Sequence, residues 1–254
     1  MPYKLLGTEV NPYSLAGLLQ VIKKSIDNHE QLIVASQNLH SIYLLHKSKD
    51  LQALQSLAIK RVDGMPIVYM GRLLGYPLEK DHRITWVDLI HPLMKTAAEN
   101  GWRVFYLGAD EKSVSKGMEA LRIEYPSLKI DYRNGFFDAA VTSPDNNEVI
   151  IKINAFNPDI LIVGMGMPRQ EKWIYENRSS IHANVIMTCG AAIEYVAGTV
   201  KIPPRWMGRA GLEWFFRLTE NPKRFWYRYM VEPWYVFGLF VKDFTKKRIL
   251  NKPI

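Results

Sequence analysis

Short apolar runs alternate with helical patterns through the first 190 residues, and this alternation limits the possible folds more than any other feature. Runs of strand character are followed by amphipathic segments of helical period, one after another. Such an order is typical of a mostly parallel sheet with helices on both faces. The sequence therefore predicts an α/β fold with a Rossmann-like, doubly wound sheet. We expect strands at 31–36, 102–107, 128–132, 159–163 and 184–189, and helices at 14–27, 39–59, 66–75, 86–100, 111–125, 146–156 and 169–178.

Turns of small residues follow three of these strands, and each turn leads into a helix. Gly108 follows the first of the three, Gly164 and Gly166 follow the second, and Gly190 follows the third. Glycine lets backbone N–H groups come close to a phosphate, and a helix N-terminus favours negative charge. Any single turn of this kind also occurs as a plain tight turn. Three of them at one sheet edge favour a nucleotide or another phosphorylated ligand.

Composition changes sharply near residue 200. The segment 201–254 holds 12 Lys/Arg against 4 Asp/Glu, which accounts for the whole net charge of +8, and 13 of the 30 aromatic residues. We therefore expect a neutral α/β domain over 1–200 and a basic, aromatic-rich helical appendage over 201–254, which we call the tail. The single cysteine, Cys189, fits a reducing cytoplasm. We expect neither a signal peptide nor a spanning helix, because no apolar run reaches about 18 residues.

Several strings in this order resemble the WecG/TagA/CpsF glycosyltransferase family. They are Asp63-Gly64-Met65-Pro66, the run 164–173 with the sequence GMGMPRQEKW, and Gly211-Leu212-Glu213-Trp214 followed by Arg217. The segment 36–38 and the pair Arg83 and Asp88 match further family positions, and the resemblance runs from about residue 30 to 230. Trp86 and Val87 depart from it, since the family usually has Gly-Ala or similar residues there.

The resemblance implies an inverting, metal-independent enzyme of the cytoplasm. It would move a hexose, namely glucose, N-acetylmannosamine or its uronic acid, from a UDP-sugar to a polyprenyl-diphosphate-linked saccharide of a cell-surface polysaccharide. Inverting transfer needs a base for the acceptor hydroxyl and positive charge at the leaving diphosphate. The family match assigns these tasks to Asp63 and Arg83. Without it, Asp63 also fits a helix N-cap and Arg83 fits a solvated charged loop.

Further residues are candidates for substrate binding. Those at strand ends, where ligands of such sheets bind, are Ser36, Asn38, Gly108, Gly164, Gly166, Gln170 and Glu171; those in the appendage are Arg217, Arg224 and Arg228. No Asp-x-Asp and no histidine pair of ligand spacing occurs, so we expect no metal site and no cofactor. Arginine side chains and backbone dipoles then have to neutralise the diphosphate.

The appendage interleaves aromatic and basic residues, which is typical of helices that lie in a membrane interface. We therefore expect binding to an anionic membrane surface, on the inner face of the cell membrane, and leave homo-oligomerisation open. The alternative is a packing helix that closes the domain. A second function class is a non-catalytic nucleotide- or nucleic-acid-binding protein that uses the basic tail. No nucleic-acid motif occurs, so we expect no nucleic acid partner. A nucleotide-sugar oxidoreductase is disfavoured by the missing G-x-G-x-x-G.

Overall fold

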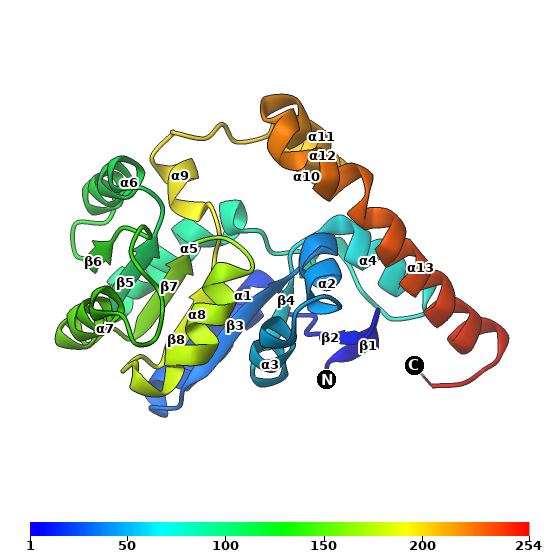
Figure 1. Cartoon of the computed structure of the whole chain (residues 1–254), viewed down its shortest axis with the longest axis horizontal. Coiled ribbons are helices and arrows are strands. Elements are labelled where there is room, and N and C mark those ends of the chain that lie inside the picture. The colour runs from blue at the N-terminus through cyan, green and yellow to red at the C-terminus, as the bar shows by residue number, and fades with distance from the viewer. Residues whose placement is uncertain (254) are drawn as a thin grey trace.

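The computed structural model describes residues 1–253, apart from the side chains of Arg205 and Arg209. A six-stranded sheet, parallel throughout, lies at its centre in the order β4-β3-β8-β7-β5-β6 (Figure 1). The predicted α/β fold is thus confirmed. The strands are β3 (Leu32–Gln37), β4 (Ile59–Val62), β5 (Arg103–Gly108), β6 (Lys129–Arg133), β7 (Ile160–Gly164) and β8 (Val185–Thr188).

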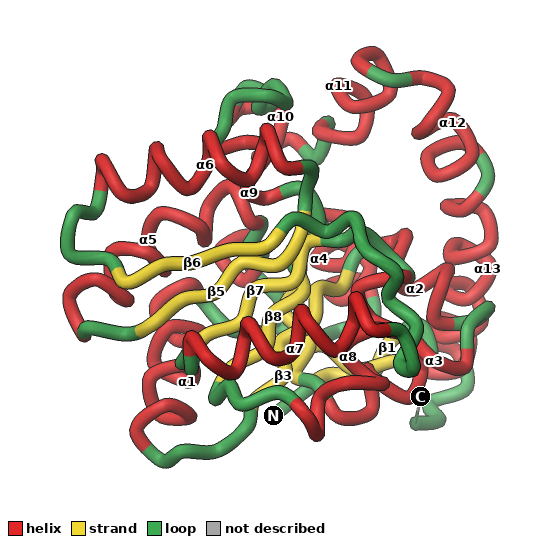
Figure 2. The backbone as a smooth tube through the Cα atoms, turned by 60° about the vertical axis from the view of Figure 1, so that its left-hand side comes forward, coloured by secondary structure: helices red, strands yellow, loops and turns green. Residues whose placement is uncertain are grey.

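Helices cover both faces of the sheet, as the doubly wound pattern predicts (Figure 2). On one face Leu18, Leu93 and Leu121 pack with other buried residues against the sheet. On the other face Leu54, Ile153 and Trp173 do the same. The helices of the first face are α1 (Leu15–Asp27), α5 (Trp86–Asn100), α6 (Glu111–Glu124) and α9 (Ala192–Val196); those of the second are α3 (Lys49–Leu57), α7 (Pro144–Phe156) and α8 (Arg169–Asn177).

Strand residues alternate between the two faces of the sheet, and residues on both faces are apolar. In β5, Val104 and Tyr106 belong to the first core, and Phe105 and Leu107 belong to the second. This period of two follows from the pleat of a strand. Because both faces are buried, the strands read as continuous apolar runs in the sequence.

The predicted single helix over 39–59 is wrong. The chain instead forms α2 (Leu39–Leu45), α3 and then strand β4. Ser48 caps the N-terminus of α3, so the helical pattern is interrupted there. Strand β4 reads Ile-Lys-Arg-Val, and two buried charged side chains hide its strand character. The hairpin of β1 (Tyr3–Leu5) and β2 (Thr8–Val10) was not predicted either.

The C-terminal region is helical, as expected, and its last long helix packs on the domain. It comprises α10 (Arg205–Ala210), α11 (Glu213–Glu220), α12 (Pro222–Met230), α13 (Glu232–Phe244) and the π-helix η3 (Thr245–Ile249). Val236 and Phe240 of α13 are buried with residues of β1, α2 and α4 (Met65–Leu73) in a third core. Asp243 accepts a hydrogen bond from the backbone N–H of Leu6 at 2.5 Å. The change in composition at residue 200 is therefore not a boundary between separate cores.

No residue of α11 or α12, both fully described, is fully buried, and Arg217 and Arg228 are partly buried. These helices lie beside α13 at the end of an extended segment that leaves α9 (Figure 1). None of the helices in the described part of the chain combines the length and the apolar character needed to cross a bilayer.

Candidate active site

Strands β3 and β8 are neighbours whose following helices pack on opposite faces of the sheet. The chain leaves β3 through α2 to α3, which belongs to the second core, and leaves β8 to α9, which belongs to the first. In α/β sheets, ligands bind at such a reversal, beyond the carboxyl ends of the strands. We call this region of the sheet edge the crevice. Most of the predicted site residues lie at this edge.

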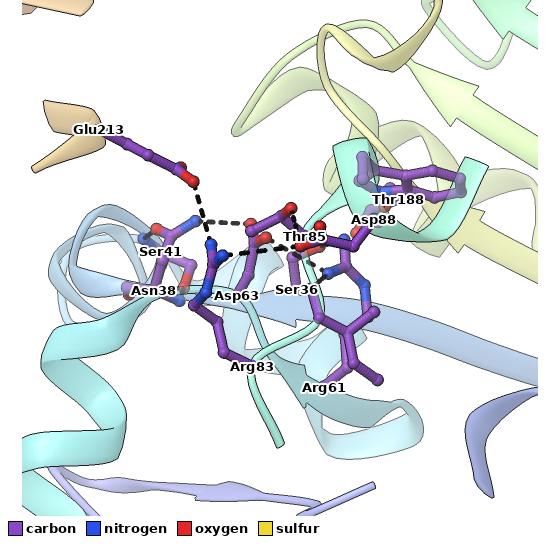
Figure 3. Close-up of polar contacts among 12 residues, drawn as sticks. Ser36, Asn38, Ser41, Arg61, Asp63, Arg83, Thr85, Asp88, Thr188 and Glu213 are labelled. Carbon is purple, nitrogen blue, oxygen red and sulfur yellow. Dashed lines mark hydrogen bonds and ion pairs between the residues drawn. The ribbon is translucent and has the colours of Figure 1, made fainter. Parts of the chain in front are cut away.

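Asp63 follows β4 directly and lies among hydrogen-bond donors. One carboxylate oxygen accepts from the Asn38 amide at 3.2 Å, and the other accepts from Arg61 at 3.3 Å. Arg61 also donates to the Ser36 hydroxyl at 2.7 Å. We call these four residues, Ser36, Asn38, Arg61 and Asp63, the Asp63 cluster (Figure 3). Its members come from two adjacent strand ends, so the sheet itself sets their spacing.

The geometry excludes the N-cap interpretation of Asp63. Gly64, not Asp63, is the N-cap of α4, and no side chain caps that helix. The Asp63 side chain instead faces Asn38 and Arg61, with about 20% of its surface exposed. Asn38 is itself the N-cap of α2 and accepts from the Ser41 backbone N–H at 3.0 Å, which fixes the amide. Asp63 therefore presents a partly open carboxylate at the crevice.

Arg83 is not part of a solvated loop. Its side chain is only 13% exposed and forms ion pairs with Glu213 at 3.0 Å and with Asp88 at 3.6 Å. Asp88 is held in turn by the Thr85 hydroxyl at 2.7 Å. Glu213 belongs to α11, so the C-terminal region reaches the same crevice as the Asp63 cluster (Figure 3). Sequence reasoning gave Glu213 no site role, because a pair 130 residues apart leaves no local signal.

Of the three arginines predicted in the tail, two lie within electrostatic range of Asp63. The Arg217 guanidinium lies 5.8 Å from the ring of Tyr195, and its Nε is buried without a hydrogen-bond partner among the described residues. Burial lowers the pKa of Arg228, while negative groups that include Asp63 oppose that shift. Arg217 interacts electrostatically with Asp63 as well. Two guanidinium groups from α11 and α12 thus lie within electrostatic range of the carboxylate.

Arg224 faces another part of the edge. It is exposed and lies within electrostatic range of Glu194 on α9. Burial raises the pKa of the Glu194 carboxyl, and the charge of Arg224 opposes that rise. Basic side chains of the tail therefore approach both sides of the crevice.

The glycines at the strand ends divide into two kinds. A Cβ at Gly108 would lie 2.3 Å from the Gly164 carbonyl oxygen, and one at Gly164 would meet Tyr106 and Gly190. These two glycines let β5, β7 and β8 end side by side. Gly166 has φ +81°, and a Cβ added to it would have no neighbouring atom within 4 Å. Its turn is open, which suits the approach of a ligand to the backbone.

Gln170 is buried and uses its amide inside the protein. Its oxygen accepts from the backbone N–H groups of Gly166 and Gly190, both at 3.2 Å, and its nitrogen donates to Glu171 at 2.7 Å. Gln170 thereby ties together two of the three turns. Burial raises the pKa of the Glu171 carboxyl to about 7, and one of its oxygens has no hydrogen-bond partner among the described residues. Direct contacts of either side chain with substrate stay a prediction.

Metal ligands do not gather at this edge. Among the described residues, no group of three or more His, Cys, Asp or Glu side chains could hold a metal ion. The groups that could neutralise a diphosphate at the crevice are the guanidinium groups of Arg83, Arg217 and Arg228.

Comparison with known proteins agrees with the geometry. Residues 3–249 match the Glycosyl transferase WecG/TagA/CpsF family. An N-acetylglucosaminyldiphosphoundecaprenol N-acetyl-beta-D-mannosaminyltransferase of Bacillus subtilis (strain 168) is 32% identical over 248 residues, which cover 95% of this chain and 93% of the relative. The transferase of the same name from Staphylococcus aureus (strain MW2) is 27% identical over 224 residues, or 87% and 85% of the two chains.

Proposed function

This chain belongs to the Glycosyl transferase WecG/TagA/CpsF family, and we propose that it transfers a hexose from a UDP-sugar to a polyprenyl-diphosphate-linked saccharide. The observation that carries the proposal is the partly exposed Asp63 carboxylate at the carboxyl edge of the sheet, held by the Asn38 amide and the Arg61 guanidinium. The relatives' names state a diphosphoundecaprenol-linked acceptor and an N-acetylmannosaminyl group. The donor sugar here is N-acetylmannosamine, its uronic acid or glucose.

Asp63 acts as the general base in the proposed reaction. It takes the proton of an acceptor hydroxyl while that oxygen forms a bond to C1 of the donor sugar. The bond between C1 and the UDP oxygen breaks on the opposite side, so the configuration at C1 inverts. A positioned base contributes roughly 10²- to 10⁴-fold to such a step.

Arginine side chains stabilise the departing diphosphate. Arg83 lies at the crevice on the domain, and Arg217 and Arg228 of the tail lie within electrostatic range of Asp63. Planar guanidinium groups bind phosphate oxygens with two parallel hydrogen bonds. Arg83 is paired with Glu213 and Asp88 in this structure, so the incoming diphosphate competes with these carboxylates. We propose that these charges serve in place of a metal ion.

The exposed aromatic side chains of the tail bind the membrane surface that carries the acceptor. Trp206, Trp226 and Trp234 are more than half exposed, and basic residues lie between them. Aromatic rings favour the headgroup level, and each basic residue near an anionic leaflet contributes about 1 kcal/mol. Peripheral attachment to the cytoplasmic face would bring the crevice to a lipid-linked sugar.

A transfer assay tests the proposal. The full-length protein is incubated with each radiolabelled UDP-sugar and a polyprenyl-diphosphate-linked N-acetylglucosamine, in buffer that contains EDTA. We expect label in the lipid fraction with one donor and release of UDP in equal amount. Binding of nucleotide or nucleic acid with no labelled product from any donor would contradict the proposal and favour a non-catalytic binding protein.

A further inference from the structure

Arg61 is the most deeply buried charged side chain near the crevice. It is only 1% exposed, and its guanidinium reaches three separate segments of the chain. One terminal nitrogen donates to Ser36 on β3; the other donates to Asp63 after β4 and to the backbone oxygen of Ile84 before α5. The group therefore links every segment that shapes this side of the crevice.

An aromatic ring supports the guanidinium. Arg61 lies 5.5 Å from the centroid of the Trp86 ring, at the start of α5. The Trp86 indole N–H donates to the Thr188 carbonyl oxygen at 2.9 Å, which fixes the ring to the end of β8. Trp86, Arg61 and Asp63 form a series of contacts from β8 to β4. The ring and the three hydrogen-bond acceptors together restrict the guanidinium, so the direction of its N–H groups is set as well.

Stability alone does not explain a cation at this place. Removing a charge from water costs several kcal/mol, and a pair of buried charges is often no better than apolar residues of the same volume. Asp63 is the carboxylate with which the Arg61 guanidinium forms its ion pair. Arg61 and Asp63 are two residues apart at the end of one strand, so their side chains leave on the same side. The cation is placed where it can act on that carboxylate.

We propose that Arg61 is the positioning residue of the Asp63 base. Its N–H holds one carboxylate oxygen, and the Asn38 amide holds the other, so that the carboxylate cannot turn away from the acceptor. Each oxygen keeps a second lone pair for the acceptor proton. Arg61 itself touches neither substrate, because its side chain is covered. This inference rests on the proposed function, in which Asp63 removes that proton.

Four full-length proteins test the inference: wild type, Arg61→Lys, Asp63→Asn and the double variant. Lysine keeps the charge but cannot reach Ser36, Asp63 and Ile84 at once. We expect Arg61→Lys to lower kcat about 10²-fold, the cost of a small misplacement of a reacting group, with donor KM and UDP affinity unchanged. In the Asp63→Asn background the same change should add less than about twofold, because residues that act as one unit are not additive.

The matched control changes another arginine whose guanidinium lies over an aromatic ring. Arg103 lies 4.4 Å from the ring of Phe156 and donates to that residue's carbonyl oxygen at 2.7 Å, at the opposite end of the sheet. Arg103→Lys should lower the melting temperature and leave kcat within about twofold. Should Arg61→Lys lack the native circular dichroism spectrum, Ser36→Ala loosens Arg61 without removing it, and should lower kcat only when Asp63 is present.

The outcomes separate the two proposals. A wild-type protein that transfers no sugar overturns the proposed function and the role of Arg61 with it. If wild type transfers sugar and Asp63→Asn does not, the proposed function stands. The role of Arg61 is then overturned by a full kcat in Arg61→Lys, or by an equal loss from Arg61→Lys in both backgrounds.

Discussion

The sheet edge buries polar side chains, whereas helices α11 and α12 expose apolar ones. At the sheet edge, polar side chains such as Ser36, Arg61 and Gln170 are buried and form hydrogen bonds within the protein. In α11 and α12 no residue is buried, and large aromatic side chains face outwards. A fixed polar crevice suits a reaction that needs exact geometry, whereas exposed aromatic surface is unfavourable in water and suits a lipid interface. In the proposed function the base lies at the sheet edge, arginine side chains of the tail complete the site, and the outward-facing aromatic side chains of the tail contact the membrane.

Helix α13 shows that the division is not one of sequence position. It lies in the basic tail, yet Val236 and Phe240 are buried in a core shared with α2 and α4. The same core includes Leu5 and Leu6 of the N-terminal hairpin. The tail is thus attached firmly at α13, and α11 and α12 are carried on that attachment above the crevice.

The largest effect is expected at the base. Asp63→Asn keeps the shape of the side chain but cannot take a proton, so transfer should fall by about 10²- to 10⁴-fold. UDP affinity, measured by isothermal titration, should stay close to that of the wild type. A variant that keeps more than about a tenth of the wild-type turnover would show that the carboxylate is not the base.

Arg83 should show a smaller effect that depends on the side chain. Arg83→Ala removes the guanidinium and should lower kcat/KM for the donor by about 10²-fold, the usual loss for one donor to a developing anion. Arg83→Lys keeps the charge but not the planar fork, so it should be intermediate. Steady-state kinetics with varied donor gives both values. Wild-type kinetics in both variants would mean that the ion pair with Glu213 is only structural.

The free energy of unfolding should depend on pH through the Glu171 carboxyl. Its pKa is raised by burial to about 7 from an ordinary value of 4.5. Between these values the folded chain keeps a proton that the unfolded chain has lost. The contribution of this group to the free energy of unfolding therefore falls as the pH rises, by up to about 3 kcal/mol.

Thermal melts from pH 4 to 8 measure this effect against Glu171→Gln, which cannot titrate. The difference in melting temperature between the two proteins should move in favour of the variant as the pH rises towards 7. A difference that does not vary with pH would show that Glu171 titrates normally.

The smallest effect is expected at α13. Asp243→Ala leaves the buried Leu6 N–H without its partner and should destabilise the fold by about 1–3 kcal/mol. Lys242→Ala, at an exposed neighbouring position, is the control and should change little. Urea unfolding measures both. Equal stabilities would mean that α13 does not belong to the domain's core in solution.

The sequence predicted the helices and strands that the spacing of apolar residues determines. Five of the six central strands and most of the helices lie where the apolar runs and caps indicate. Strand β4 was not predicted, because Lys60 and Arg61 give it a polar sequence, although both side chains are buried. The partners of the Arg61 side chain come from β3 and α5, which no local pattern reveals.

The same limit applies to the site. Asp63 and Arg83 were predicted as site residues from family motifs, because the local sequence of Asp63 also fits a helix cap and that of Arg83 a solvated loop. Arg61 was missed, although Arg-x-Asp at a strand end places both side chains on one face. Glu213 was missed as a partner of Arg83, because that contact joins distant parts of the chain. Spacing within one element is readable in the sequence, and contacts between elements are not.

The claim that domain and tail build one active site can be tested by removing equal charge at two places. Arg217→Ala with Arg228→Ala removes the two tail guanidinium groups that lie within electrostatic range of Asp63. Lys242→Ala with Lys246→Ala removes two exposed charges on α13 and η3. Circular dichroism checks folding, and transfer to the lipid-linked acceptor is measured on anionic liposomes. We predict a loss of at least about 10²-fold for the arginine pair and less than about threefold for the lysine pair. Equal transfer by both double variants would contradict a shared site and leave the tail a purely structural or membrane-binding role.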